Sequence, residues 1–173
     1  MQKDSGQTNN HPWNYSNLYN YPMSEKHEYT VNLKWKNDRK GEISSPELST
    51  IIEVATPIDF PKGMPDIWSP EHLFVAAVNT CLMTTFLAIA ENSKLEFISF
   101  KCNAVGVLDK VDGKFLVSEI TLKPELTVPE GTNEERAIRI IEKSEQHCLI
   151  SNSIKTNILL EPKIIVEQKT ASV

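Results

Sequence analysis

The sequence predicts an α+β domain in which helices pack on an antiparallel sheet, and three observations carry that prediction. Apolar and polar residues alternate from Tyr29 to Trp35, which is typical of a half-buried strand. The apolar stretch 73–90 is long enough for one extended helix. An Asp-Gly pair at 112–113 lies between two strand-like segments, as in a β-hairpin. Such runs of strands and helices define the α+β class.

Length and composition indicate one domain. The chain has 173 residues, 40% of them hydrophobic, and can therefore bury one sizeable core. We place this domain at 25–168, after a flexible N-terminal tail at 1–24 and before a C-terminal tail at 169–173. The N-terminal segment is rich in asparagine and shows no sustained period of 2 or 3.6, which favours a tail.

Charge and cysteine content exclude several classes of function. A net charge of -5 and the lack of any run of Lys or Arg argue against nucleic-acid binding. The three cysteines show no CxxC or Cys/His ligand spacing, so we expect no metal site and no disulfide framework of a secreted protein. The first residues lack the apolar core of a secretory signal, and we expect a cytoplasmic protein.

The first elements of the domain are expected to be strands. The strand that includes Tyr29 and Trp35 ends at a polar turn over 37–41, and a second strand follows at 48–54. The segment 57–65 contains three prolines and a glycine, which favours a loop.

A long helix is expected from Pro70 to about position 91. Ser69 can cap its first turn, Pro70 suits the first helical position, and Glu71 complements the helix dipole. Asn79 and three threonines interrupt the apolar residues, which favours a buried helix over a membrane span. Because apolar residues occupy most faces, the protein or a partner subunit must surround the helix.

The C-terminal half contains the hairpin, a second helix and a last strand. The strands 97–108 and 114–126 should pair antiparallel through the turn 111–114. Residues 132–135 open a helix that ends near Gln146. The apolar segment 158–166 is interrupted by Pro162, which indicates an edge position or a bulge.

The cysteines are the candidates for chemistry. Cys81 lies within the long helix, where a cysteine is ordinarily a small buried apolar residue. A reactive role requires a nearby cation, since a free thiol has a pKa of about 8.5 and is mostly protonated. Cys148 follows a helix end, a more suitable place for a reactive thiol, whereas Cys102 lies in a strand and is taken as a structural or surface residue. His147 precedes Cys148 but does not face it on a helix.

The segment that reads Ser-Pro-Glu-His-Leu-Phe-Val-Ala-Ala from Ser69, followed by Cys81, resembles the helix of the OsmC/Ohr family. This family takes its name from osmotically inducible protein C and organic hydroperoxide resistance protein. Glu71 and Cys81 are ten positions apart, as in that helix. The segment Cys148 to Ser151 resembles the family's resolving-cysteine segment, and it lies 67 positions after Cys81.

A third motif and the length of the matching region also support the resemblance. Residues 35–41 resemble the turn that supplies an arginine near the reactive thiol, with Arg39 as the candidate and Lys40 as the alternative. The resemblance runs from about 29 to 166. Leu149 stands where many Ohr proteins have a proline, which favours the broader OsmC-like branch.

The resemblance implies a thiol-dependent peroxidase that reduces organic hydroperoxides to alcohols. Cys81 would attack the peroxide, and Cys148 would close a disulfide on the resulting sulfenic acid. Arg39 would stabilise the Cys81 thiolate, with Glu71 holding the guanidinium. No cofactor is expected, and an external dithiol would reopen the disulfide. The alternative is an OsmC-like protein without enzymatic activity that binds a small apolar ligand or senses redox state.

The expected substrate pocket is apolar. Phe74, Leu82 and Phe86 are candidates for its lining, although core packing is the ordinary role of such residues.

The spacing within the helix constrains the site. Ten residues of unbroken helix span about 15 Å, so Glu71 and Cys81 of one straight helix cannot share a site. Either the helix breaks between them or a second chain supplies Arg39 and Glu71. The resemblance implies an intertwined homodimer with sites at its interface, which fits the second option. We therefore expect a homodimer, with no membrane partner.

Overall fold

The computed structural model describes residues 26–168, and these form an α+β fold with two sheets. The elements are β1 (Asn32–Asn37), β2 (Lys40–Ser44), β3 (Ile52–Ala55), α1 (Pro70–Asn92), β4 (Ser99–Val111), β5 (Lys114–Pro129), α2 (Glu134–Gln146), the short 3-10 helix η2 (Ser151–Ser153), β6 (Asn157–Leu160) and β7 (Lys163–Glu167). The predicted fold class is confirmed. The tails expected at 1–24 and 169–173 lie outside the described residues.

The larger sheet is built on the predicted hairpin. β4 and β5 pair antiparallel around Asp112 and Gly113, and Gly113 adopts the left-handed φ of 79° that this turn requires. β6 and β7 both run parallel to β5, so the sheet is mixed. The predicted single last strand is therefore two short ones, because Pro162 interrupts it at the sheet edge.

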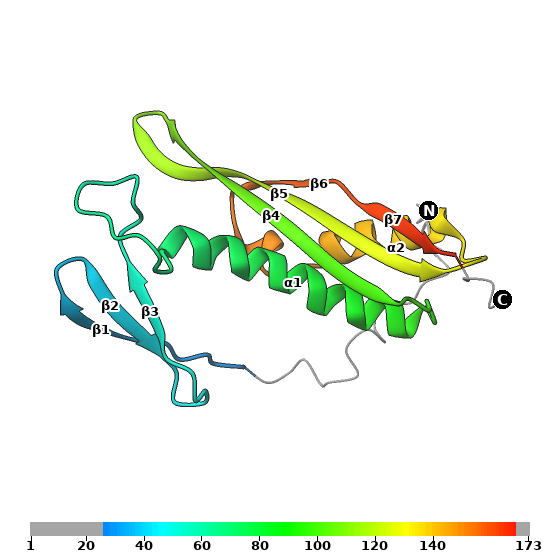
Figure 1. The fold of residues 1–173 in the computed structure, drawn as a ribbon, viewed down its shortest axis with the longest axis horizontal. Helices are drawn as coiled ribbons and strands as arrows, with labels where there is room; N and C mark the ends of the chain where they lie inside the picture. The colour runs from blue at the N-terminus through cyan, green and yellow to red at the C-terminus, as the bar shows by residue number, and fades with distance from the viewer. Residues whose placement is uncertain (1–25, 169–173) are drawn as a thin grey trace, which may run out of the picture.

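Helix α1 is continuous from Pro70 to Asn92 and runs along β4 (Figure 1). The Ser69 hydroxyl accepts a hydrogen bond from the His72 backbone N–H at 3.3 Å, and His72 Nδ1 accepts from the Ser69 N–H at 3.4 Å. This reciprocal cap fixes the start of the helix with a histidine in place of the usual Glu or Gln.

The core lies between the helices and one face of the larger sheet. Phe86 stacks on Phe100 of β4 with ring centroids 4.6 Å apart, and Ile141 of α2 belongs to the same cluster. Leu82 and Phe86 are fully buried here, so their expected role in a substrate pocket is wrong: they pack the core. Phe74 is half-buried and lines a separate surface cavity.

Much of α1 faces outward in the single chain. Among the described residues it is the one helix long and apolar enough to cross a membrane, and about a third of its most apolar window is buried. Core helices of soluble proteins have the same length and composition, so this property is weak grounds for a membrane span. Met83 and Leu87 are the exposed apolar residues on α1.

The smaller sheet, β1–β2–β3, stands at the end of the molecule away from α2 (Figure 1). The prediction of a half-buried first strand is wrong for the isolated chain, because every residue of β1 is exposed. Leu33 and Trp35 each keep 71% of their surface accessible. The alternating pattern therefore marks an apolar face that nothing in residues 26–168 covers.

Substitution of Gly106 is expected to destabilise the contact between β4 and α1. A Cβ at this position would lie 2.5 Å from Cγ2 of Val75, so Gly106→Ala should lower the free energy of unfolding by about 1–3 kcal/mol. Denaturant unfolding measures this change. In a Val75→Ala background the added methyl has room, and the penalty should disappear; an equal penalty in both backgrounds would contradict this explanation.

Candidate functional site

Cys81 and Cys148 lie together between α1 and the segment that follows α2. Their thiols are close enough to interact, and both are free. Cys81 is half-buried, whereas only 1% of the surface of Cys148 is exposed. The fold thus brings two cysteines that are 67 positions apart into contact without any constraint from a bond between them.

The surroundings of Cys148 favour its protonated form. Burial raises the pKa of the Cys148 thiol, and the neighbouring Cys81 raises it further. Ser151 opposes this shift, since its backbone N–H donates to Cys148 Sγ at 3.4 Å. At neutral pH Cys148 is therefore a thiol, which is a weak nucleophile until it loses its proton.

Glu145 and the Ser151 hydroxyl complete this cluster. Burial raises the pKa of the Glu145 carboxyl, and Ser151 partly offsets that shift. Ser151 Oγ is buried and near enough to influence both Glu145 and Cys148, yet it forms no hydrogen bond of standard geometry among the described residues. Sequence reasoning missed Glu145; its place three residues before Cys148, at a helix end, was the available signal. His147 Nδ1 lies 2.8 Å from the Lys143 carbonyl oxygen and donates to it.

Arg39 and Glu71 line a cavity at the N-terminal end of α1, apart from the two cysteines. This cavity of about 620 Å³ lies between β1–β3, the loop after β3 and the first turn of α1, and its lining includes neither Cys81 nor Cys148. Glu71 Oε2 is buried and has no hydrogen-bond partner among residues 26–168. A buried carboxylate oxygen without a partner is costly, so this site is chemically incomplete in one chain.

The structure separates the two candidate cations beside this cavity. Lys40 Nζ already forms an ion pair with Glu53 at 3.0 Å across the sheet. The Arg39 guanidinium forms no ion pair or hydrogen bond within the part of the chain that the structure describes, and Arg39 is exposed. The turn that holds it is fixed by Trp35, whose Nε1 donates to the Asp38 carbonyl at 3.2 Å. Arg39 is therefore the cation available to a carboxylate or a substrate.

The unbroken α1 excludes the first of the two options, a break in the helix between Glu71 and Cys81. Because the helix has no break from Pro70 to Asn92, Glu71 and Cys81 stand about 15 Å apart along its axis. The structure brings Cys81 and Cys148 together, and it places Arg39 and Glu71 around one cavity. It does not bring these two pairs together within one chain.

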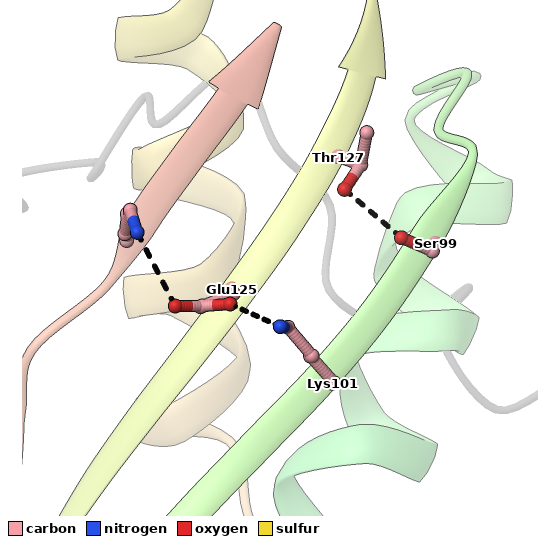
Figure 2. A network of polar contacts seen from close by, with 5 residues as sticks. Ser99, Lys101, Glu125 and Thr127 are labelled. Atoms are coloured by element: carbon pink, nitrogen blue, oxygen red, sulfur yellow. Dashed lines mark hydrogen bonds and ion pairs between the residues drawn. The ribbon is translucent and has the colours of Figure 1, made fainter. Parts of the chain in front are cut away.

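The outer face of the larger sheet carries charges that are already paired. Glu125 accepts from Lys101 at 2.6 Å and from Lys163 at 3.4 Å, and these contacts lower the pKa of its carboxyl (Figure 2). Beside this pair, Ser99 Oγ donates to Thr127 Oγ1 at 2.9 Å (Figure 2). A cleft in this region takes its lining mainly from these ion-paired side chains, three lysines and two glutamates, with Glu125 shared by two of the lysines.

Cys102 points to the inner face of the same sheet. Burial raises the pKa of the Cys102 thiol to about 11, against a smaller opposing contribution from a Lys123 backbone hydrogen bond. It therefore stays protonated at neutral pH. Within residues 26–168, no group of three or more His, Cys, Asp or Glu side chains is arranged to hold a metal ion.

Comparison with known proteins places the chain among α+β proteins of one family. The family described as OsmC-like protein matches residues 63–163, which is more than half of the chain. The chain therefore belongs to the OsmC-like protein family. It is 25% identical over 140 residues to the uncharacterized protein YmaD of Bacillus subtilis, covering 78% of this chain and 91% of that protein. It is 31% identical over 93 residues to the peroxiredoxin OsmC of Escherichia coli, covering 54% of this chain and 64% of that protein.

Solved structures share the fold at low sequence identity. An OsmC-like protein of unknown function from Vibrio cholerae superposes with a TM-score of 0.71 at 24% identity, covering 81% of this chain and all of that one. An organic hydroperoxide resistance protein from Elizabethkingia anophelis gives a TM-score of 0.66 at 24% identity, covering 83% of this chain and all of that one. The predicted OsmC/Ohr resemblance is thus confirmed.

Proposed function

We propose that this protein is a thiol-dependent peroxidase that reduces organic hydroperoxides to alcohols. The contact between the half-buried Cys81 thiol and the buried Cys148 thiol is the observation that carries the proposal. An attacking thiol needs access to solvent, and a resolving thiol needs to be within reach of it. The names of the Escherichia coli and Elizabethkingia anophelis relatives, a peroxiredoxin and a hydroperoxide resistance protein, support the same chemistry.

The reaction proceeds through the two cysteines alone. The Cys81 thiolate attacks the distal peroxide oxygen, the O–O bond breaks, and the alcohol leaves while Cys81 becomes a sulfenic acid. Cys148 then attacks the Cys81 sulfur, a disulfide forms and water is released. An external dithiol reduces the disulfide by exchange. Because sulfur carries both electrons, no cofactor takes part, and a reducing cytoplasm is the setting that supplies the dithiol.

The cation for Cys81 comes from a second copy of the chain. Arg39 and Glu71 share a cavity that is about 15 Å along α1 from the Cys81 of the same chain. In a homodimer, Arg39 of one protomer meets the thiols of its partner and stabilises the Cys81 thiolate electrostatically, while Glu71 holds the guanidinium by a two-point ion pair. The exposed apolar residues of β1 and α1 are the surfaces that this assembly buries.

Stopped-flow oxidation of the reduced protein by cumene hydroperoxide and by hydrogen peroxide tests the proposal. The wild type should react faster with the organic peroxide, Cys81→Ser should abolish the reaction, and Cys148→Ser should accumulate sulfenic acid. Cys102→Ser, which removes a thiol outside the cluster, is the matched control and should behave as the wild type. Equally slow oxidation of the wild type and Cys81→Ser would reject the peroxidase in favour of ligand binding.

A further inference from the structure

The resolving thiol has a proton that it must lose. Cys148 is almost fully buried, and both burial and the neighbouring Cys81 raise the pKa of its thiol. The nucleophile in disulfide formation is the thiolate. Rapid closure at neutral pH therefore requires a group beside Cys148 that accepts this proton during the attack.

The backbone around Cys148 gathers three side chains into one turn. The Cys148 N–H donates to the Glu145 carbonyl at 3.0 Å, and the Asn152 N–H donates to the Cys148 carbonyl at 3.1 Å. The Ser151 N–H donates to Cys148 Sγ at 3.4 Å. Glu145 precedes and Ser151 follows the cysteine by three residues, and these backbone contacts hold both residues next to it.

The Ser151 hydroxyl is the link between the acid and the thiol. Its oxygen is buried and has no hydrogen-bond partner of standard geometry among the described residues. Ser151 lowers the pKa of both Glu145 and Cys148, against the rise that burial causes in each. A hydroxyl both donates and accepts, so it can pass a proton from the sulfur on one side to the carboxylate on the other.

We infer that Glu145 accepts the Cys148 proton through the Ser151 hydroxyl and so drives disulfide closure. This inference rests on the peroxidase proposed above, which supplies the Cys81 sulfenic acid. The Cys148 proton moves to Ser151 Oγ while the Ser151 proton moves to Glu145, and the sulfur electron pair attacks the Cys81 sulfur. The Cys81 S–O bond breaks, and the leaving hydroxide takes a proton from the cluster as water. Cys148 is oxidised and the Cys81 sulfenyl sulfur is reduced.

Other titratable groups of the described residues near the cluster have contacts of their own. From α1, Cys81 faces Cys148 and is the reaction partner. On α2, Lys143 and His147 meet through the Lys143 carbonyl and the imidazole. From β7, Lys163 forms its ion pair on the outer face of the sheet. The carboxyl of Glu145 is the acid that interacts with Ser151.

The pH dependence of closure distinguishes proton transfer from a structural role. In the wild type, the rate of disulfide closure should fall when the pH drops through the raised pKa of Glu145. Above that pKa the rate should be independent of pH. In Glu145→Gln the thiol must ionise without help, so the rate should rise about tenfold per pH unit through the neutral range. The raised pKa of Cys148 extends that rise into alkaline pH.

A single-turnover experiment with one equivalent of cumene hydroperoxide tests the inference. Sulfenic acid trapping with dimedone separates Cys81 oxidation from disulfide closure. Glu145→Gln should leave the oxidation rate unchanged and slow closure at neutral pH about 10²-fold. Ser151→Ala should show the same defect, and Glu145→Asp should recover part of the rate. The control Glu142→Gln, an exposed acid on the same helix, should match the wild type. Closure by Glu145→Gln at the wild-type rate and pH dependence would overturn the inference.

A second assay keeps the inference apart from the proposed function. A thionitrobenzoate mixed disulfide on Cys81 replaces the sulfenic acid, and attack by Cys148 releases coloured thionitrobenzoate without any peroxide. Glu145→Gln should slow this release about 10²-fold in the same pH-dependent way. If peroxide fails to oxidise the protein while thionitrobenzoate release still depends on Glu145, the result would reject the proposed peroxidase activity and support Glu145 as the proton acceptor. Release that is independent of Glu145 would overturn the proton acceptor.

Discussion

An equimolar mixture of Cys81→Ser and Arg39→Ala chains will reduce cumene hydroperoxide, although each variant alone is nearly inactive. If Arg39 acts on the thiol of the partner, a mixed dimer holds one intact site. That site combines Arg39 and Glu71 from the Cys81→Ser chain with both cysteines of the Arg39→Ala chain. Random pairing makes half of the dimers mixed, so the mixture should recover about a quarter of wild-type activity.

The measurement requires mixed dimers, so the two variants are co-expressed with different affinity tags and the mixed dimer is isolated. With one intact site of two, the isolated mixed dimer should show about half of wild-type activity. A matched control pairs Arg39→Ala with Glu71→Gln. Both changes affect the half of the site that holds Arg39 and Glu71. Neither chain of that mixed dimer carries both residues intact, so peroxidase activity should stay low. Activity of the first mixture no higher than the mean of its two parents would show that the site lies within one chain.

A glutamate at Leu87 is expected to separate the subunits and abolish peroxidase activity. Leu87 lies on the outward face of α1 and keeps 43% of its surface accessible in the single chain. Burial of a carboxylate in an apolar interface without a partner costs several kcal/mol, enough to dissociate a dimer at micromolar concentration. Without the partner, Cys81 loses access to Arg39.

Sedimentation velocity and the cumene hydroperoxide assay, run at the same protein concentrations, measure both effects of Leu87→Glu. Val111→Glu is the control, because Val111 is 40% exposed but lies at the tip of the β4–β5 hairpin. That variant should remain dimeric and active. A monomeric Leu87→Glu protein with full activity would contradict a site shared between chains.

Local signals predicted most of the elements. The Ser69–Pro70 start of α1 and the Asp-Gly turn at 112–113 depend on chemistry within a few residues, and both fell where expected. Strand β2 was missed, because Lys40–Ser44 carries two charges and a glycine and shows no alternation. The two strands within 157–167 were merged, since Pro162 signals an interruption without giving its geometry.

The arrangement of the site could not be predicted from sequence spacing alone, because it depends on tertiary contacts. Family resemblance named the two cysteines, but their contact follows from the packing of α1 against α2. The choice of Arg39 over Lys40 required the ion pair between Lys40 and Glu53 on neighbouring strands. The long helix was predicted to be surrounded on all sides, and the periodicity of its sequence cannot separate faces that meet the core from faces that meet another chain.

The proximity of the reduced thiols has a consequence for the lifetime of the protein. When Cys81 and Cys148 join, the bond ties the middle of one helix to the end of another and closes a loop of 67 positions. In the chain-entropy description, a loop of this length raises the free energy of unfolding by about 4 kcal/mol. If the proposed cycle operates, the oxidised form is therefore the one that resists unfolding more strongly, and it should outlast the reduced form wherever the dithiol is scarce.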